Sequence, residues 1–127
     1  MAMVPLTDLE ALISLVIQSH QPKPCMVLIH SDQCPPCMAL HPKLSGLASD
    51  MEGYAFYAFN VDSCDPPWKD YVLTLLFKEW DVKYLPTQIL LATGRARKVI
   101  FTTNLDTIKS ELAALDGTRA QTPLQKS

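Results

Sequence analysis

The amino-acid sequence predicts an α/β fold in which a mixed central sheet is flanked by helices on both faces as a three-layer sandwich. Two apolar strand-like segments, 25–29 and 54–61, alternate with helical segments, which indicates parallel strands joined by helices. Two further apolar segments, 87–91 and 98–101, flank a turn at 93–95 and predict an antiparallel hairpin. A length of 127 residues fits one domain.

The first helix is expected to begin near Thr7, because Thr7 and Glu10 have capping-box spacing. Apolar residues recur on one helical face as far as Ile17, and the Pro-rich sequence 21–24 ends the helix. The unbroken apolar run 25–29 then suits a strand that is buried on both faces of a sheet.

The remaining helices follow from apolar spacing and from their end signals. They are predicted at 38–51, which contains Pro42, at 68–80, and at about 105–115. In the third helix the side chains expected to face inward are Tyr71, Val72, Leu75, Leu76 and Phe77.

Asn104 suits the N-cap of the last helix and Gly117 its end. We therefore expect one domain over residues 1–117 and a disordered polar tail over residues 118–127.

Composition excludes several classes of function. The formal net charge of −2 does not favour binding to nucleic acid or to an anionic membrane. No apolar run approaches the ~20 residues of a membrane helix, and the N-terminus does not resemble a secretory signal. We therefore expect a cytoplasmic protein whose four cysteines serve chemistry rather than a disulfide framework. A structural zinc site usually needs a second close-spaced ligand pair, which the sequence lacks, so no metal is expected.

The sequence Cys34-Pro35-Pro36-Cys37 lies where a buried strand passes into a helix. Unpaired amide groups and the dipole at a helix N-terminus stabilise an anion, and the thiolate anion is the nucleophile of disulfide exchange. Pro35 and Pro36 have no amide hydrogen, so the amide of Cys37 is the expected local donor to Cys34. We therefore expect Cys34 to attack and Cys37 to resolve the mixed disulfide.

From Val4 to Leu115 the chain resembles the thioredoxin family. The resemblance depends on a combination of motifs: the apolar strand before Cys34-Pro35-Pro36-Cys37, Pro42 in the following helix, Asn60-Val61-Asp62, and Tyr84-Leu85-Pro86-Thr87. The Cys-Pro-Pro-Cys motif is similar to that of tryparedoxins and nucleoredoxins. The resemblance implies a thioredoxin-like fold, a cis peptide bond before Pro86, and a substrate groove formed by Gln33, Pro35, Pro36, Leu85, Pro86 and Thr87.

Three positions depart from the family pattern. Gln33 replaces the usual tryptophan before the first cysteine, Leu28 replaces a buried acid, and Ala58 replaces a lysine. The segment from Asp65 to Tyr84 is also longer than its family counterpart by roughly nine residues, about two and a half helical turns.

His30 is the candidate for the missing proton acceptor, since an imidazole titrates near neutral pH. The interpretation favoured here is a polar residue at a strand end without that role. His41 is expected to be a surface residue. Cys64 is either a regulatory thiol, by resemblance to animal thioredoxins, or an unreactive loop cysteine, and the second reading is favoured. Cys25 is expected in the core.

Two functions of different class remain. The first is a thiol–disulfide oxidoreductase that reduces protein disulfides through Cys34 and Cys37, needs no bound cofactor, works as a monomer and is regenerated by an external reductase. The second is a thioredoxin-fold adaptor that binds a partner protein without redox chemistry, which the three departures favour. A fold alone does not decide between them.

Overall fold

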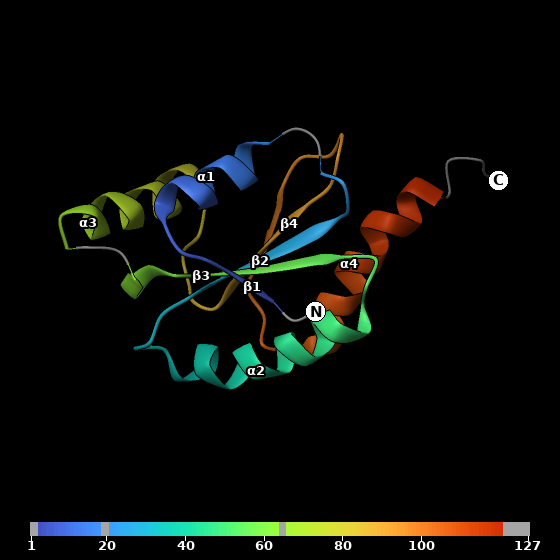
Figure 1. The fold of residues 1–127 in the computed structure, drawn as a ribbon, viewed down its shortest axis with the longest axis horizontal. Coiled ribbons are helices and arrows are strands. Elements are labelled where there is room, and N and C mark those ends of the chain that lie inside the picture. The colour runs from blue at the N-terminus through green and yellow to red at the C-terminus, as the bar shows by residue number, and fades with distance from the viewer. Residues whose placement is uncertain (1–2, 19–20, 64–65, 121–127) are drawn as a thin grey trace.

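A five-stranded sheet lies between two pairs of helices in the computed structural model, which describes residues 3–18, 21–63 and 66–120 (Figure 1). The elements in chain order are β1 (Val4–Leu6), α1 (Leu9–Ile17), β2 (Cys25–His30), α2 (Pro35–Asp50), β3 (Ala55–Asn60), η1 (Val61–Ser63), α3 (Pro66–Thr74), η2 (Leu75–Glu79), β4 (Thr87–Leu91), β5 (Lys98–Ile100) and α4 (Leu105–Ala120). The predicted three-layer α/β sandwich with a mixed sheet is confirmed.

The strand order is β1-β3-β2-β4-β5. Strands β1, β3 and β2 are parallel, whereas β4 is antiparallel to β2 and β5 is antiparallel to β4. At one edge of the sheet His30 lies opposite Asn60, and Ile29 lies opposite Thr87. The end of β2, the end of β3 and the start of β4 therefore meet at this edge, and the loops that leave it come together in space.

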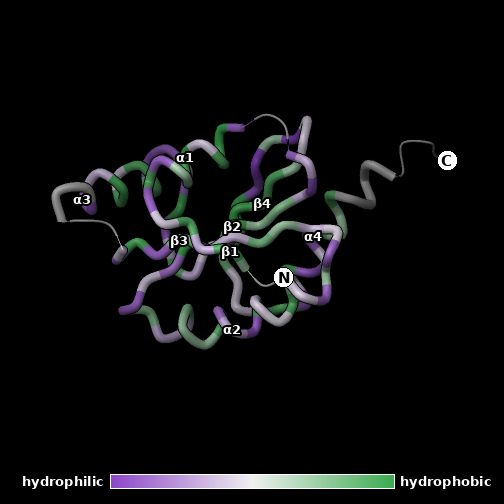
Figure 2. Tube along the Cα trace, viewed as in Figure 1, coloured by the Kyte–Doolittle hydropathy of each residue, from purple (hydrophilic) through white to green (hydrophobic). Residues whose placement is uncertain are grey.

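Strand β2 explains how both helical layers are attached. Along it Cys25, Val27 and Ile29 pack in one apolar cluster with α1, α3 and η2, while Met26 and Leu28 pack in a second cluster with α2 and α4. Figure 2 shows β2 and β4 as hydrophobic segments at the centre of the molecule. A strand with apolar side chains on both faces is stable only between two covering layers, as the sequence predicted.

The helix ends agree with the sequence in part. Asn104 caps α4 as predicted, since its Oδ1 accepts hydrogen bonds from the amides of Asp106 and Thr107 at 2.8 and 3.2 Å. The predicted cap of α1 is wrong by one residue, because Asp8 accepts the hydrogen bond from the amide of Ala11.

The predicted helix end at Gly117 is also wrong, since α4 continues to Ala120. Of the predicted tail, residues 121–127 lie outside the described residues. Within the part of the chain that the structure describes, no helix combines the length and apolarity needed to cross a membrane.

Strand β1 has no counterpart among the predicted elements. It has only three residues, which is too short for an alternating pattern, and it contains Pro5. A proline is tolerated there because β1 is an edge strand. Its place beside β3 comes from tertiary pairing rather than from a local sequence signal.

The third helix is longer and less regular than the predicted one. It continues from α3 into η2, a π-helical turn in which the amide of Trp80 donates to the carbonyl of Leu75 at 3.2 Å. Asp81 then takes a left-handed conformation with φ 60°, which Asp tolerates better than most residues, and the helix ends.

Burial along this helix follows one narrow stripe. Val72, Leu76 and Trp80 are buried against α1 and the sheet. The expectation that Tyr71 and Phe77 also face inward is wrong, because their side chains are 53% and 55% exposed. Leu75 is half-buried and packs against the same cluster, as predicted, whereas the rings of Tyr71 and Phe77 lie at the surface.

Candidate active site around Cys34 and Cys37

Cys34 and Cys37 form a disulfide across the first turn of α2, with their Cα atoms 5.2 Å apart. Strand β2 ends at His30 and α2 begins at Pro35. Residues 31–34 connect them, and the last of these, Cys34, is the N-cap of α2. The two sulfur-bearing side chains differ in exposure, since Cys34 is half-buried and Cys37 is fully buried. An incoming group can therefore reach Cys34 more easily than Cys37.

Backbone groups surround Cys34 as the strand-to-helix transition requires. The amide of Cys37 points at Cys34 Sγ, at 3.3 Å, which confirms the predicted local donor. The amide of Cys34 donates to the carbonyl of Ser31 at 3.2 Å, and so closes the loop. Pro35 and Pro36 are exposed in the first turn of α2, where no amide hydrogen is needed. This arrangement can stabilise a thiolate at Cys34.

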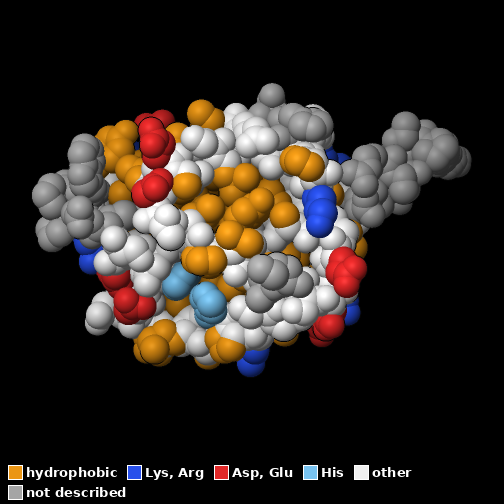
Figure 3. Space-filling view, in the orientation of Figure 1, with side chains coloured by type: hydrophobic (Ala, Val, Ile, Leu, Met, Phe, Trp, Pro, Cys, Tyr) orange, Lys and Arg blue, Asp and Glu red, His pale blue; other side chains and the backbone are white. Residues whose placement is uncertain are grey.

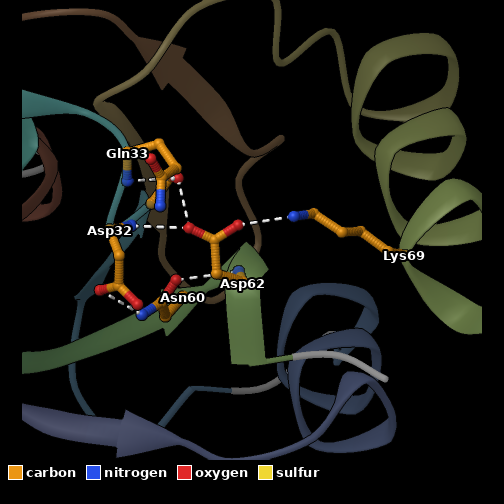
Figure 4. Close-up of polar contacts among 6 residues, drawn as sticks. Asp32, Gln33, Asn60, Asp62 and Lys69 are labelled. Atoms are coloured by element: carbon orange, nitrogen blue, oxygen red, sulfur yellow. Dashed lines mark hydrogen bonds and ion pairs between the residues drawn. The ribbon is translucent and has the colours of Figure 1, made fainter. Parts of the chain in front are cut away.

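The loop before Cys34 is held by Asp62, which follows β3 (Figure 4). The Asp62 carboxylate accepts hydrogen bonds from Ser31 Oγ at 2.6 Å and from the amide of Asp32 at 2.8 Å. Ser31 Oγ in turn accepts from the amide of Gln33 at 3.0 Å. The contacts connect the end of β3 to the loop that carries the cysteines.

Two further side chains complete this network. Asn60 donates through Nδ2 to Asp32 at 2.9 Å and accepts from the amide of Asp62 at 2.9 Å. Lys69, from α3, donates to the second oxygen of Asp62 at 2.7 Å. The hydrogen bonds from Lys69 and Ser31 hold the pKa of Asp62 at about 2, below the ordinary value of 3.8. The sequence did not reveal this role for Asp62, and its only signal was the polar pair Asn60 and Asp62 after an apolar strand.

His30 and His41 form a pair of rings from the two elements that flank the loop before Cys34. His30 ends β2, His41 lies on α2, and their rings meet edge to face with centroids 5.1 Å apart. Figure 3 shows the two histidines in contact at the rim of a hydrophobic area. His41 is half-buried, and its contact with His30 was not predicted from the sequence. Burial first, and then the neighbouring His41, lower the pKa of His30, although Asp32 and Asp62 act in the opposite direction.

The segment before β4 supplies the opposite wall of the site. The peptide bond between Leu85 and Pro86 is cis, as the sequence resemblance implied. Because Thr87 pairs with Ile29, this bond lies at the same sheet edge as the loop before Cys34. Leu85 is half-buried, whereas Pro86 and Thr87 are buried, and the Thr87 hydroxyl donates to the carbonyl of Tyr84. Of these three residues, only Leu85 is partly open to solvent.

The positions that depart from the family pattern are apolar or exposed. Leu28 and Ala58 lie opposite each other on β2 and β3, and both are buried in the cluster with α2 and α4. No proton acceptor is supplied at either position. Gln33 is exposed beside Cys34 and provides a polar amide where an aromatic ring would give a flat apolar surface.

Of the other two cysteines, the structure describes Cys25. Cys25 is buried at the start of β2, and burial raises the pKa of its thiol to about 12. Cys64 lies outside the described residues. Among the described residues, no group of three or more His, Cys, Asp or Glu side chains is placed to hold a metal ion.

Comparison with solved structures identifies the fold. The structure matches thioredoxin NaTrxh from Nicotiana alata with a TM-score of 0.70 at 17% identity, covering 88% of this chain and 90% of that one. It matches a thioredoxin from Fasciola hepatica with a TM-score of 0.65 at 19% identity, covering 87% and 97%. Mitochondrial thioredoxin 3 from Saccharomyces cerevisiae gives 0.65 at 21% identity, covering 87% and 93%.

The fold is the thioredoxin fold. No protein-family model matches the chain, and no curated protein sequence matches it. A thioredoxin fold with a disulfide between Cys34 and Cys37 indicates thiol–disulfide chemistry.

Proposed function

We propose that the protein reduces disulfide bonds in other proteins by dithiol–disulfide exchange. The observation that carries this proposal is the bonded pair of a half-buried Cys34 at the N-terminus of α2 and a fully buried Cys37. An accessible sulfur at a helix N-terminus suits the attacking role, and a sheltered sulfur next to it suits resolution. We also propose that the protein is of the tryparedoxin and nucleoredoxin type, because its Cys-Pro-Pro-Cys motif is similar to theirs.

The reaction runs in two exchanges. The Cys34 thiolate attacks one sulfur of the substrate disulfide, a Cys34–substrate disulfide forms, and the other substrate sulfur leaves as a thiolate that takes a proton. The Cys37 thiol then loses its proton and attacks Cys34 Sγ. The substrate leaves as a second thiol, and Cys34–Cys37 is the disulfide that remains. Two electrons pass from the protein to the substrate, so no bound cofactor is required.

The cycle needs an external dithiol reductase to return the two electrons to Cys34 and Cys37. We place this cycle in the cytoplasm, where a reducing environment supports it. The substrate groove we propose is formed by Gln33, Pro35, Pro36, Leu85, Pro86 and Thr87, on the resemblance of these positions to thioredoxins.

Proton transfer from Cys37 needs an acceptor other than the one found in thioredoxins. Leu28 and Ala58 provide no acceptor. We propose His30 as the acceptor, because it ends the strand that leads to Cys34 and its lowered pKa keeps the imidazole neutral at pH 7. A neutral imidazole can accept a proton from a thiol directly or through water.

Trapping of mixed disulfides tests the roles of the two cysteines. Cys37→Ser should accumulate a covalent adduct with substrate proteins, because the second exchange cannot occur. Cys34→Ser should accumulate none. Adducts on Cys34→Ser but not on Cys37→Ser would reverse the assignment.

The reduction potential of the pair tests the direction of exchange. We titrate the pair against dithiol buffers, alkylate the free thiols and measure the fraction alkylated by mass. The two-electron transition should lie at about −270 mV, as in thioredoxin. A value between about −120 and −180 mV would instead indicate an oxidase or isomerase.

A second candidate is a redox-inactive adaptor, which the apolar pair Leu28 and Ala58 and the exposed Gln33 favour. An adaptor would bind its partner equally well when both cysteines are replaced by serine. The oxidoreductase would lose covalent capture and turnover in the same variant. This single comparison separates the two functions.

A further inference from the structure

An apolar groove runs between η2 and the segment that leads to the cis peptide bond. It has a volume of about 380 Å³. One wall carries Leu73 and Phe77, and the other carries Tyr84 and Leu85. Leu73, Phe77 and Tyr84 are 42%, 55% and 69% exposed, so large apolar side chains that would favour burial are left in contact with water.

Two residues that line the groove are adjacent in sequence to residues of the proposed active site. Leu85 lines the groove and precedes Pro86. Val61 also lines it and precedes Asp62, whose carboxylate holds the loop before Cys34. A chain that lies along the cis-proline segment can therefore continue into the groove without leaving the surface.

The charged side chains that line the groove are all basic among the described residues. Lys78 and Lys83 line it, and no carboxylate does so among the described residues. Lys83 is paired with the exposed Asp81 at 3.1 Å. Lys78 takes part in none of the ion pairs found in the described part of the chain, so its charge is available to a ligand. An acidic group next to an apolar one would complement these walls.

We propose that this groove binds the extended segment beside the target cysteine of the substrate protein, through a large apolar side chain next to a carboxylate. The inference depends on the proposed function, because it names the substrate class of the same site. The apolar side chain packs against Leu73, Phe77 and Tyr84. The carboxylate lies at Lys78. Substrate disulfides in such a segment are then preferred over others.

Peptide disulfides test this preference. A panel of short peptides with one internal disulfide would place Phe-Glu, Phe-Lys or Ser-Ser at successive positions on either side of the cysteines. The second-order rate constant for single-turnover reduction of each peptide by the dithiol form of the protein is compared with that for 5,5′-dithiobis(2-nitrobenzoate), which is too small to use the groove. We expect one Phe-Glu position to raise this rate constant about fivefold over Ser-Ser, the effect of burying part of one phenylalanine side chain.

Matched variants connect the preference to the groove. Phe77→Ser should remove most of the fivefold preference, whereas Ile17→Ser, at an exposed apolar residue of α1, should leave it intact. Lys78→Glu should reverse the preference for Phe-Glu over Phe-Lys, and Lys109→Glu on α4 should not. Reduction of the small disulfide should be unchanged in all four variants. A preference that survives Phe77→Ser overturns the proposal.

Binding without chemistry separates this proposal from the proposed function. Fluorescence anisotropy of a labelled, disulfide-free Phe-Glu peptide on Cys34→Ser/Cys37→Ser protein should show saturable binding that Phe77→Ser weakens. Binding without any disulfide reduction by the wild type would reject the oxidoreductase and keep the groove. Reduction of the small disulfide without peptide binding would do the reverse. Concentration-dependent dimerisation that Phe77→Ser abolishes would show that a second copy is the occupant, and would overturn the proposal.

Discussion

The rings of His30 and His41 meet edge to face with their centroids 5.1 Å apart, one from the end of β2 and the other from α2. Two half-buried imidazoles from different elements are therefore in contact. The charge of His41 disfavours protonation of His30, because like charges at this distance repel. The titration of His30 is therefore a direct probe of how the site is arranged.

His41→Gln should raise the pKa of His30 from its lowered value. The substitution removes the like charge, but the burial that contributes most to the lowering remains. Asp32→Asn should lower the pKa of His30 further, because it removes an attractive charge. Titration of the imidazole signals by NMR measures both. Lys109→Gln is the control for loss of a remote charge, and an unchanged His30 pKa in His41→Gln would contradict the assigned contact.

The same depressed pKa makes stability depend on pH. Because the folded protein holds a proton on His30 less tightly than the unfolded chain does, stability falls as the pH falls from 6.5 through the folded-state pKa. His30→Gln should flatten this part of the curve when urea unfolding of the oxidised protein is followed between pH 7 and pH 5. A curve of unchanged slope would show that His30 does not contribute to it.

Asp62→Asn should destabilise the oxidised protein by about 1–2 kcal/mol at pH 7, because charge-assisted hydrogen bonds to Ser31, Asp32 and Lys69 are lost. The pKa of Asp62 is lowered to about 2, so its contribution is complete above 3.8 and disappears as the pH falls through 2. Urea unfolding at several pH values should therefore show the wild type and variant converging in acid. Glu52→Gln, at an exposed turn, is the control. A constant difference at all pH values would be inconsistent with a charge effect.

Gln88→Leu should destabilise the protein by about 2 kcal/mol, because two backbone groups lose their partner. Gln88 is fully buried; its Nε2 donates to the carbonyl of Thr102 at 3.0 Å, and its Oε1 accepts from the amide of Thr102 at 3.1 Å. The amide of Thr102 should also exchange faster with solvent in the variant, as hydrogen exchange will measure. Gln33→Leu, the same change at an exposed residue, should alter stability by less than about 0.5 kcal/mol. An unaltered exchange rate of the Thr102 amide would show that Gln88 does not hold this amide in a hydrogen bond.

Cys25 should resist alkylation by iodoacetamide at pH 8 as long as the protein is folded. Its side chain is buried, and burial raises the pKa of its thiol to about 12, so little thiolate is present or accessible. Labelling, followed by mass spectrometry, should be at least about a hundredfold slower than in concentrated urea, because it must wait for unfolding. Fast labelling of Cys25 in native protein would mean that the start of β2 opens locally.

Local patterns predicted the central features of the fold. The apolar run of β2 required cover on both faces, the turn around Gly94 produced a hairpin, and Asn104 began α4. The same reasoning placed Cys34 and Cys37 at the junction of a strand and a helix. These features depend on residues close to one another in sequence, so a local pattern is enough to predict them.

The predictions that failed are those that depended on packing. The exposure of Phe77 follows from which stripe of α3 and η2 meets the sheet, and β1 exists only because β3 is beside it. The helix pattern marks apolar residues at several positions around the axis, but it does not say which of them a neighbouring layer will cover.

What the sequence by itself determined, then, is the α/β architecture, the pairing of Cys34 with Cys37, and the cis-proline segment that its resemblance to thioredoxins implied. Only the tertiary structure decided that Asp62 holds the loop before Cys34, that His41 meets His30, and that η2 faces the segment before Pro86 across an apolar groove. The physical reason is separation along the chain. Residues far apart in sequence meet through strand register and helix packing, which are set by burial over the whole core rather than by any local pattern.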